Sequence, residues 1–216
     1  MKRYIFLGGG GFATELLEYM SSDEHAVKGY YSKEDNLELS RHIPWLGDIH
    51  TVAEKELDRE AEYIVAVRNI GYRRKMIDII DRNRLQVGSY ISKRAYFSRF
   101  AQLGQGAVVF PNAIIGGNAV AGDYLFMDIY AAISHGDVIG NNVVLGPAVI
   151  LSGDSEIGND VTFGTQSAIL PGSKIGNHVE IAINTYPRKR VKDHSVVSSG
   201  PGRRFEVRER TERIMV

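Results

Sequence analysis

A six-residue period runs through the second half of the sequence and limits the possible folds more than any other feature. Counted in steps of six from Leu103 to Ile181, the first position of every hexapeptide is apolar, and the second is glycine in eight of the fourteen hexapeptides. The fifth position is mostly small or β-branched. An α-helix cannot produce this pattern, because its turn of 3.6 residues does not divide six. A short repeat at fixed spacing is typical of a solenoid.

The repeat predicts a triangular parallel β-helix. Each hexapeptide forms one flat side and a corner, so that three hexapeptides make one coil. First-position side chains point inward and stack between coils, small fifth-position residues fill the narrow interior, and the glycines are expected to relieve the backbone at the corners. Fourteen hexapeptides give between four and five coils.

The first part of the chain has a different pattern, in which short apolar runs alternate with longer polar stretches. This alternation predicts a small parallel sheet with crossover helices, a Rossmann-like α/β module. The predicted division is 1–92 for the α/β module, 93–204 for the left-handed β-helix and 205–216 for a C-terminal tail or helix. The strands are expected at Tyr4–Leu7, Val27–Tyr31, Ala61–Val67 and Leu85–Ile91, and the helices at Phe12–Met20, Thr51–Glu60 and Tyr72–Arg84.

Composition excludes several function classes. The 216 residues include 26 Lys and Arg and 26 Asp and Glu, so the net charge is zero and we expect neither nucleic acid nor a membrane as partner. The absence of cysteine excludes disulfides, thiolate metal sites and a cysteine nucleophile. The opening MKRYIFLGGGG has too short an apolar run for a signal peptide, and no run approaches a membrane span. A soluble, cytoplasmic protein is therefore expected.

Five segments, in this order, resemble the sugar O/N-acetyltransferase family from Tyr4 to about Arg203. They are YIFLGGGGFATELLEYM, IPWLGD, IVAVRNIGYRRK, ISHGDVIGNNVVLGPAVILSGDSEIGNDVTFGTQSAILPG and SVVSSGPGRRF. The resemblance implies an acetyl-CoA-dependent N-acetyltransferase that modifies a nucleotide-linked amino sugar for surface glycan biosynthesis. It also implies a homotrimer with active sites between subunits. A sugar O-acetyltransferase and a non-catalytic nucleotide-sugar-binding homologue remain alternatives.

The resemblance assigns the catalytic base to His135. Imidazole is suited to removing a proton from an amine near neutral pH. Family members follow this histidine with Asp or Glu, whereas this chain has Gly136. Two other acids, Asp137 and Asp128, are candidates. Asp137 is at an inward position, and we expect it either to reach back to His135 or to cap backbone donors inside the coil. Asp128 holds the substrate amine, orients the imidazole or is a solvated loop acid.

Other site residues are expected in two groups. No metal is expected, because a metal enzyme on this scaffold needs a histidine cluster, and positions 117 and 153, one coil from His135, are glycines. His178 and His194 are expected to be ordinary exposed residues. The substrate group is Gly9, Gly10, Gly11, Phe12, Tyr31, Ser32, Arg68 and Asn69. The acetyl-CoA group, implied by the resemblance and by the late basic cluster, is Gly146, Gly164, Thr165, Ile183, Arg188, Lys189 and Arg190.

Overall fold

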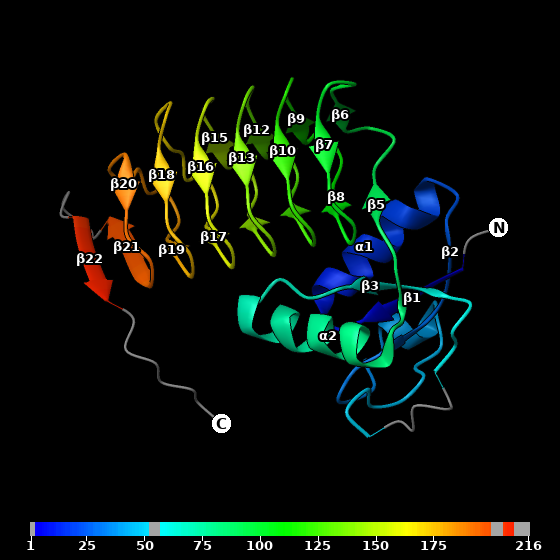
Figure 1. Ribbon diagram of the computed structural model, residues 1–216. Helices are drawn as coiled ribbons and strands as arrows, with labels where there is room; N and C mark the ends of the chain where they lie inside the picture. Colours follow the sequence, from blue (N-terminus) through cyan, green and yellow to red (C-terminus); the bar gives the residue numbers. More distant parts are fainter. Residues whose placement is uncertain (1–2, 52–56, 200–204, 210–216) are drawn as a thin grey trace.

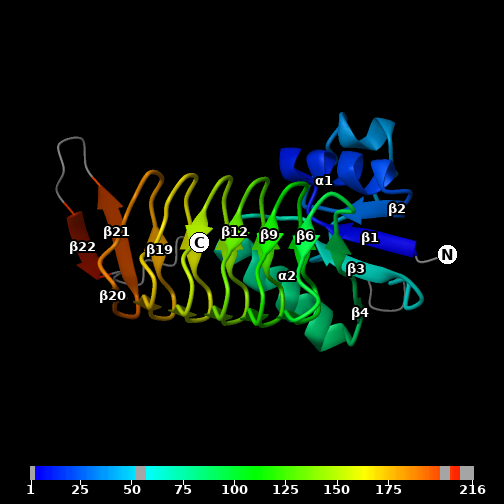
Figure 2. The ribbon, with the colours of Figure 1, turned by 90° about the horizontal axis from the view of Figure 1, so that it is seen from above.

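The computed structural model describes residues 3–51, 57–199 and 205–209. A small α/β module lies against one end of a long parallel β-solenoid, whose coils stack away from it (Figure 1). Helix α2 runs beneath the first coils, and the last strands lie at the far end (Figure 2). None of the helices in the described part of the chain is long and apolar enough to cross a lipid bilayer.

The α/β module has a four-stranded parallel sheet in the order β2-β1-β3-β4. Most of its elements lie where the hydrophobic pattern predicts them, because a buried strand and a one-sided helix leave different periods in the sequence. In chain order they are β1 (Arg3–Leu7), α1 (Gly11–Ser22), β2 (Ala26–Tyr31), the 3-10 helix η1 (Leu39–Arg41), β3 (Glu62–Val65), α2 (Ile70–Asn83) and β4 (Gln86–Val87).

Two predictions for this module are corrected. The strand predicted at Leu85–Ile91 is two strands: β4 pairs with β3, whereas Tyr90–Ile91 pairs with the solenoid strand Val108–Val109. Gly88 separates them and fits closely against the sheet, since a Cβ there would lie 2.9 Å from the side chain of Ile64. The helix predicted at Thr51–Glu60 falls partly outside the described residues, and 57–60 form a bend and turn rather than a helix.

The solenoid has three sheets, which we call the β5, β6 and β7 faces after their first strands. Partners in neighbouring coils differ by 18 residues, as Phe126 and Val144 do, which confirms the predicted coil length. The β5 face contains β5 (Tyr90–Ile91), β8 (Val108–Val109), β11 (Phe126–Met127), β14 (Val144–Leu145), β17 (Thr162–Phe163), β19 (Glu180–Ile181), β21 (Ser195–Ser199) and β22 (Phe205–Glu209). The β6 face contains β6 (Tyr96–Phe97), β9 (Ile114–Ile115), β12 (Ala132–Ile133) and β15 (Ile150–Leu151). The β7 face contains β7 (Gln102–Leu103), β10 (Val120–Ala121), β13 (Val138–Ile139), β16 (Glu156–Ile157), β18 (Lys174–Ile175) and β20 (Arg190–Val191).

The solenoid is longer than predicted. The β7 face has six strands, one for each coil, so the described chain forms about six coils instead of four to five. The hexapeptide register continues backward through Phe97 to Ile91, but no glycine marks the second position in these first coils. At the other end, ten residues separate Ile181 from Val191, after which the spacing of six resumes at Val197.

Side-chain burial explains why the repeat has this form. The first-position and fifth-position residues make one continuous apolar core, for example Val109 and Ala113. The corners are made by the fourth position, where non-glycine residues such as Asn118 and Asp154 adopt a positive φ of 58° and 59°. The second-position glycines therefore do not relieve the corners, contrary to expectation. They permit close stacking of coils, since a Cβ on Gly140 would lie 2.8 Å from the backbone of Gly158.

The C-terminal segment is a further correction. Residues 205–209, predicted as a tail or helix, form strand β22, which pairs antiparallel with β21. The sequence FEVRE alternates apolar and charged residues, which is the period of a strand. An antiparallel strand ends the parallel stack and occupies the exposed edge of β21. Residues 210–216 of the predicted tail lie outside the described part.

The α/β module covers the β5 face. The buried side of α1, with Leu16 and Met20, belongs to the same apolar cluster as Val108 and Phe126 of the solenoid. Beside it, Arg73 of α2 is completely buried. The Arg73 guanidinium donates to the side-chain oxygen of Asn142 (2.9 Å) and to two backbone carbonyls, and burial lowers its pKa to about 10. These contacts fix the sheet edge relative to the coils.

Candidate active site

His135 lies at a corner of the third coil, between β12 and β13. Its side chain is 73% exposed. The same corner position is Gly117 in the preceding coil and Gly153 in the following one, so neither coil has a side chain at the position equivalent to His135. The ring lies over Gly153, where a Cβ would approach its atoms to 2.6–2.9 Å. The corner therefore presents one accessible imidazole on a rigid backbone.

The acid beside His135 comes from the next coil. The Asp154 carboxylate Oδ1 lies 3.8 Å from His135 Nδ1, and the Asp154 N–H donates to the His135 carbonyl at 3.0 Å. This residue was not among the predicted acids, Asp128 and Asp137, because it belongs to a different coil from His135. The signal was present in the coil period, since Asp154 follows Gly136 by 18 residues.

Asp137 faces the interior of the coil. Its two carboxylate oxygens accept the backbone N–H groups of Ser134 and Ser155, each at 2.9 Å. It therefore caps backbone donors, the second of the two alternatives for this residue. Burial raises the pKa of Asp137 to about 6, although the two N–H groups and the nearby His135 act in the opposite direction. Through Ser134 the carboxyl group holds the backbone just before His135.

Asp128 is directed toward the α/β module. It is 2% exposed, and its Oδ2 accepts a hydrogen bond from Arg68 Nη1 at 2.8 Å, while Oδ1 accepts the N–H of Ile129. It is therefore not a solvated loop acid. It lies at the corner before β12, whereas His135 follows β12. The ion pair joins two residues predicted for the site from sequence regions 60 positions apart.

The predicted substrate residues converge at the carboxyl edge of the α/β sheet. The parallel register places Leu7, Tyr31 and Val65 side by side at the ends of their strands. Space is open at Gly10 and Gly11, where an added Cβ would meet nothing within 4 Å. Helix α1 begins here without a side-chain cap. The segments that meet at this edge are Gly9–Phe12, Ser32, Arg68 and Asn69.

Four residues of this group have structural contacts. Tyr31 is buried in the core below the sheet edge, and the Asn69 side chain caps α2 by accepting the N–H groups of Gly71 and Tyr72. The Ser32 hydroxyl donates to the Glu34 carbonyl. Phe12 packs between the two modules.

Phe12 contacts the solenoid through its ring. It stacks on Phe110 with a centroid distance of 5.4 Å and meets Phe126 edge-on at 4.9 Å. The guanidinium of Arg68 lies over the other side of the cluster, 5.8 Å from the Phe12 centroid. Phe12 therefore holds the glycine turn against the coil that carries Asp128 and positions Arg68 at the edge.

The predicted acetyl-CoA residues lie on two edges of the solenoid. Gly146 and Gly164 follow Asp128 at successive intervals of 18 residues and stack in the same corner. Thr165 and Ile183 occupy the adjoining position in the next coils. The basic residues 188–190 are exposed, and the last of them begins strand β20 of the β7 face. They precede β20 as His135 precedes β13, so they lie on the same edge of the solenoid, three coils further along.

The other histidines near the end of the solenoid pair with each other. The rings of His178 and His194 stack at 4.7 Å, and His178 Nδ1 lies 3.4 Å from Asp160, which also binds Arg74. His194 is exposed, as expected, whereas His178 is half-buried. Within the described residues, no group of three or more His, Cys, Asp or Glu side chains is arranged to hold a metal ion.

Comparison with known proteins shows the fold. No protein-family model matches the sequence, and no curated protein matches it. Among solved structures, the acetyltransferase domain of PglB from Neisseria gonorrhoeae, in complex with acetyl coenzyme A, is similar with a TM-score of 0.82 at 20% identity, over 91% of this chain and 95% of that one. PerB from Caulobacter crescentus, in complex with CoA and GDP-perosamine, gives 0.83 at 21% identity, over 95% and 98%. WeeI from Acinetobacter baumannii gives 0.82 at 18% identity, over 95% and 100%. Both modules therefore share the fold of these proteins.

Proposed function

We propose that this protein is an acetyl-CoA-dependent N-acetyltransferase that acts on the amino group of a nucleotide-linked amino sugar in surface glycan biosynthesis. The observation that carries the proposal is the imidazole of His135, exposed at a corner where both neighbouring coils have glycine. The shared fold supports it, since PglB was crystallised with acetyl coenzyme A and PerB with CoA and GDP-perosamine.

His135 acts as the general base in this proposal. A sugar amine is mostly protonated near neutral pH and attacks a thioester only after losing a proton. The neutral amine attacks the thioester carbonyl carbon, and the nitrogen gives its remaining excess proton to the imidazole. The imidazolium then passes this proton to the departing sulfur as the carbon–sulfur bond breaks, so that CoA leaves as a thiol. Imidazole accepts and returns protons at this pH without a large energetic cost. The transfer is direct and requires no covalent enzyme intermediate.

The tetrahedral intermediate places a negative charge on the former carbonyl oxygen. Fixed backbone N–H groups stabilise such an oxyanion without reorganisation. Beside the imidazole, Gly117 of the preceding coil is half-buried, whereas Gly153 of the following coil is buried under the ring. Asp137 supports this arrangement from inside the coil by holding the Ser134 N–H.

The carboxyl edge of the α/β sheet is proposed as the nucleotide-sugar site, in the manner of a Rossmann-like module. Ligands of open parallel sheets bind at this edge. Gly10 and Gly11 allow a phosphate to approach the backbone at the start of α1, where uncapped N–H groups favour an anion. Arg68 is half exposed and supplies a fixed positive charge, since Asp128 and Phe12 hold its guanidinium.

Acetyl-CoA is proposed to bind along the solenoid toward its C-terminal end. CoA carries several phosphate charges, and Arg188, Lys189 and Arg190 form an exposed cluster of the opposite sign. The stacked glycines Gly146 and Gly164 allow the cofactor to approach the backbone. The positive charges and the accessible backbone are suited to a phosphorylated cosubstrate. No step of the proposed chemistry uses a metal.

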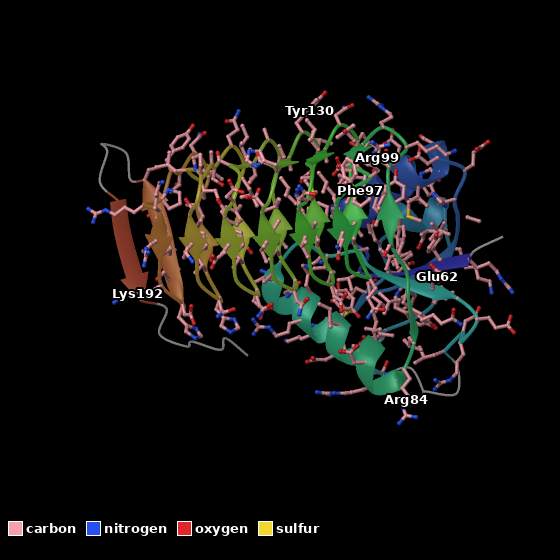
Figure 3. The ribbon with its side chains drawn as sticks, turned by 45° about the horizontal axis from the view of Figure 1, so that its top comes forward. Glu62, Arg84, Phe97, Arg99, Tyr130 and Lys192 are labelled. Atoms are coloured by element: carbon pink, nitrogen blue, oxygen red, sulfur yellow. The ribbon has the colours of Figure 1, made fainter. Side chains whose placement is uncertain are left out.

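We further propose a homotrimer with active sites between subunits, which functions in the cytoplasm, where nucleotide sugars and acetyl-CoA are made. Exposed apolar side chains flank His135 on the two faces that the α/β module leaves uncovered. Contiguous exposed apolar surface is typical of interaction sites. Tyr130, Phe97 and Arg99 lie on the rim of the solenoid, on the side opposite Arg84 at the end of α2 (Figure 3). The exposed apolar residues of the two faces include Tyr96, Phe97, Ile114 and Ile150 on the β6 face, and Val120 and Val138 on the β7 face.

A substrate panel tests the proposed function. Purified protein is incubated with acetyl-CoA and nucleotide sugars that differ in base, in the position of the amine and in amine against hydroxyl, and CoA release is followed. Turnover restricted to amino sugars supports the proposal, and turnover only of hydroxyl acceptors shows an O-acetyltransferase. If the protein binds nucleotide sugars but turns over none of the panel, the non-catalytic alternative holds. Light scattering of the same preparation measures the oligomeric state.

A further inference from the structure

The relation between His135 and Asp154 goes beyond the proposed base. In the chain, the residue after His135 is Gly136, so no acid adjoins the histidine in sequence. In the structure, Asp154 brings a carboxylate to 3.8 Å from His135 Nδ1, from the corner of the following coil. The carboxylate is therefore placed beside one of the two ring nitrogens.

Glycines at two positions make room for this pair. A Cβ on Gly136 would collide with Oδ1 of Asp154, and a Cβ on Gly153 would collide with the imidazole. The backbone does not require glycine at position 136, because equivalent corners carry Asn118 and Asn142 at similar positive φ. Gly136 is therefore explained by the space that the Asp154 carboxylate occupies.

The other acids near this corner have different contacts. The Asp137 oxygens are both taken by backbone N–H groups inside the coil, and Asp128 is held by Arg68 at the opposite end of β12. Among the described residues, the charged groups that interact with His135 are thus Asp154, at the surface, and Asp137, from the interior. Only Asp154 approaches the ring at a nitrogen.

We propose that Asp154 is the positioning acid of His135, supplied by the next coil instead of the next residue. In this proposal the proton of the neutral ring is on Nδ1, which faces the Asp154 carboxylate, so that Nε2 faces the substrate and accepts the proton from the amine. When the imidazolium forms, Asp154 stabilises its charge. This inference rests on the proposed function, since it assigns the partner of the proposed base.

The test compares Asp154→Asn with the wild-type protein in kcat and KM across pH 5.5–9. Asparagine occupies the fourth position, with a positive φ, in four other hexapeptides (Asn112, Asn118, Asn142 and Asn184), so the variant is expected to fold. We expect kcat to fall roughly tenfold across this pH range, with KM for both substrates little changed. Glu156→Gln is the matched control, because it removes one exposed negative charge from the same coil, where Glu156 pairs with Lys174. It should leave kcat unchanged across the same range.

Moving the acid to the residue after His135 tests whether the lost rate of acetyl transfer can be restored. Gly136→Asp with Asp154→Gly moves the carboxylate to the adjoining residue and removes the collision, and this double variant should recover most of the rate that Asp154→Gly loses. A purely structural role for Asp154 predicts no such recovery. The inference is overturned if Asp154→Asn keeps the wild-type rate and pH profile, or if the relocated acid restores nothing in a protein with unchanged melting temperature.

A second readout does not depend on turnover. The ring carbon and nitrogen shifts of neutral His135, in protein labelled with 13C,15N-histidine and assigned with a His135→Gln variant, report which ring nitrogen carries the proton in the wild type, Asp154→Asn and Glu156→Gln. We expect the form protonated at Nδ1 to lose population only in Asp154→Asn. If it does so while no acceptor is acetylated, the proposed function fails and the pairing stands. If it does not, the pairing is wrong whatever the activity.

Discussion

The buried carboxyl group of Asp137 gives the sharpest prediction about stability. Burial raises its pKa to about 6, whereas an aspartate in an unfolded chain titrates near ~3.9. Between these two pH values the folded protein binds more protons than the unfolded chain. The contribution of Asp137 to stability is therefore fully present below pH ~4 and is lost as the pH rises to about 6. A shift of about two pH units corresponds to about 3 kcal/mol.

The perturbation is Asp137→Asn, which keeps the size of the side chain and removes its ionisation. Asparagine loses one of the two acceptors for the Ser134 and Ser155 N–H groups, which lowers its stability by an amount that does not depend on pH. The diagnostic quantity is the difference in the free energy of unfolding between the wild type and Asp137→Asn, followed as a function of pH. For a chain of this length, about 3 kcal/mol changes the melting temperature by roughly 6–12 °C.

Thermal melting followed by circular dichroism at pH 4, 5, 6 and 7 provides the assay. The melting temperature of the wild type, relative to Asp137→Asn, should fall by that amount between pH 4 and pH 7, because the other titrating groups are common to both. Asp137→Ser, which repeats the residue found at the same interior position in the next two coils, serves as a second non-ionising variant. Parallel melting curves for all three proteins across this range would refute the reasoning.

Three further predictions concern other contacts. Arg73→Ala leaves Asn142 and two carbonyls without their buried donor, and denaturant unfolding should show a loss of about 3 kcal/mol; a loss below about 1 kcal/mol contradicts the proposed anchor. Gly153→Ala should displace the His135 ring and lower kcat/KM at least about tenfold with little change in melting temperature, whereas the matched Gly117→Ala, whose Cβ meets only a serine oxygen at 3.8 Å, should not. Replacing Arg188 and Lys189 by Ala should raise the KM for acetyl-CoA several-fold at low salt and less at high salt, with kcat unchanged; an effect independent of salt argues against phosphate contact.

The hexapeptide pattern predicted the solenoid because the inward positions follow from local geometry. Every coil places the same two positions of the hexapeptide inside. Apolar residues at these positions, such as Val109 and Ala113, therefore predict the fold from the local sequence, and contacts distant in the chain are not needed. The ends of the solenoid were harder to predict. The first coils lack the glycine that marks the others, and the strand at 205–209 depends on pairing with β21, which a local pattern does not contain.

The residues of the candidate site could be predicted where a single motif or the end of a strand marks them. They could not be predicted where the contact joins residues of two different coils. His135 was predicted from the family resemblance, and the sheet-edge residues were predicted from the ends of the strands, since parallel strands end at one edge. Asp154 was missed because its neighbour in space is a coil away in the chain. Phe12 was expected to face substrate, but its role between the modules depends on Phe110 and Phe126, which the sequence separates from it by about a hundred residues.

The most direct test of the central claim is the rate of acetyl transfer in His135→Ala. With acetyl-CoA and the best acceptor of the panel, a general base at this corner predicts that kcat falls by about 10²–10⁴-fold while the KM for acetyl-CoA and the melting temperature stay near the wild-type values. A variant that releases CoA at the wild-type rate would contradict the assignment of His135 as the base.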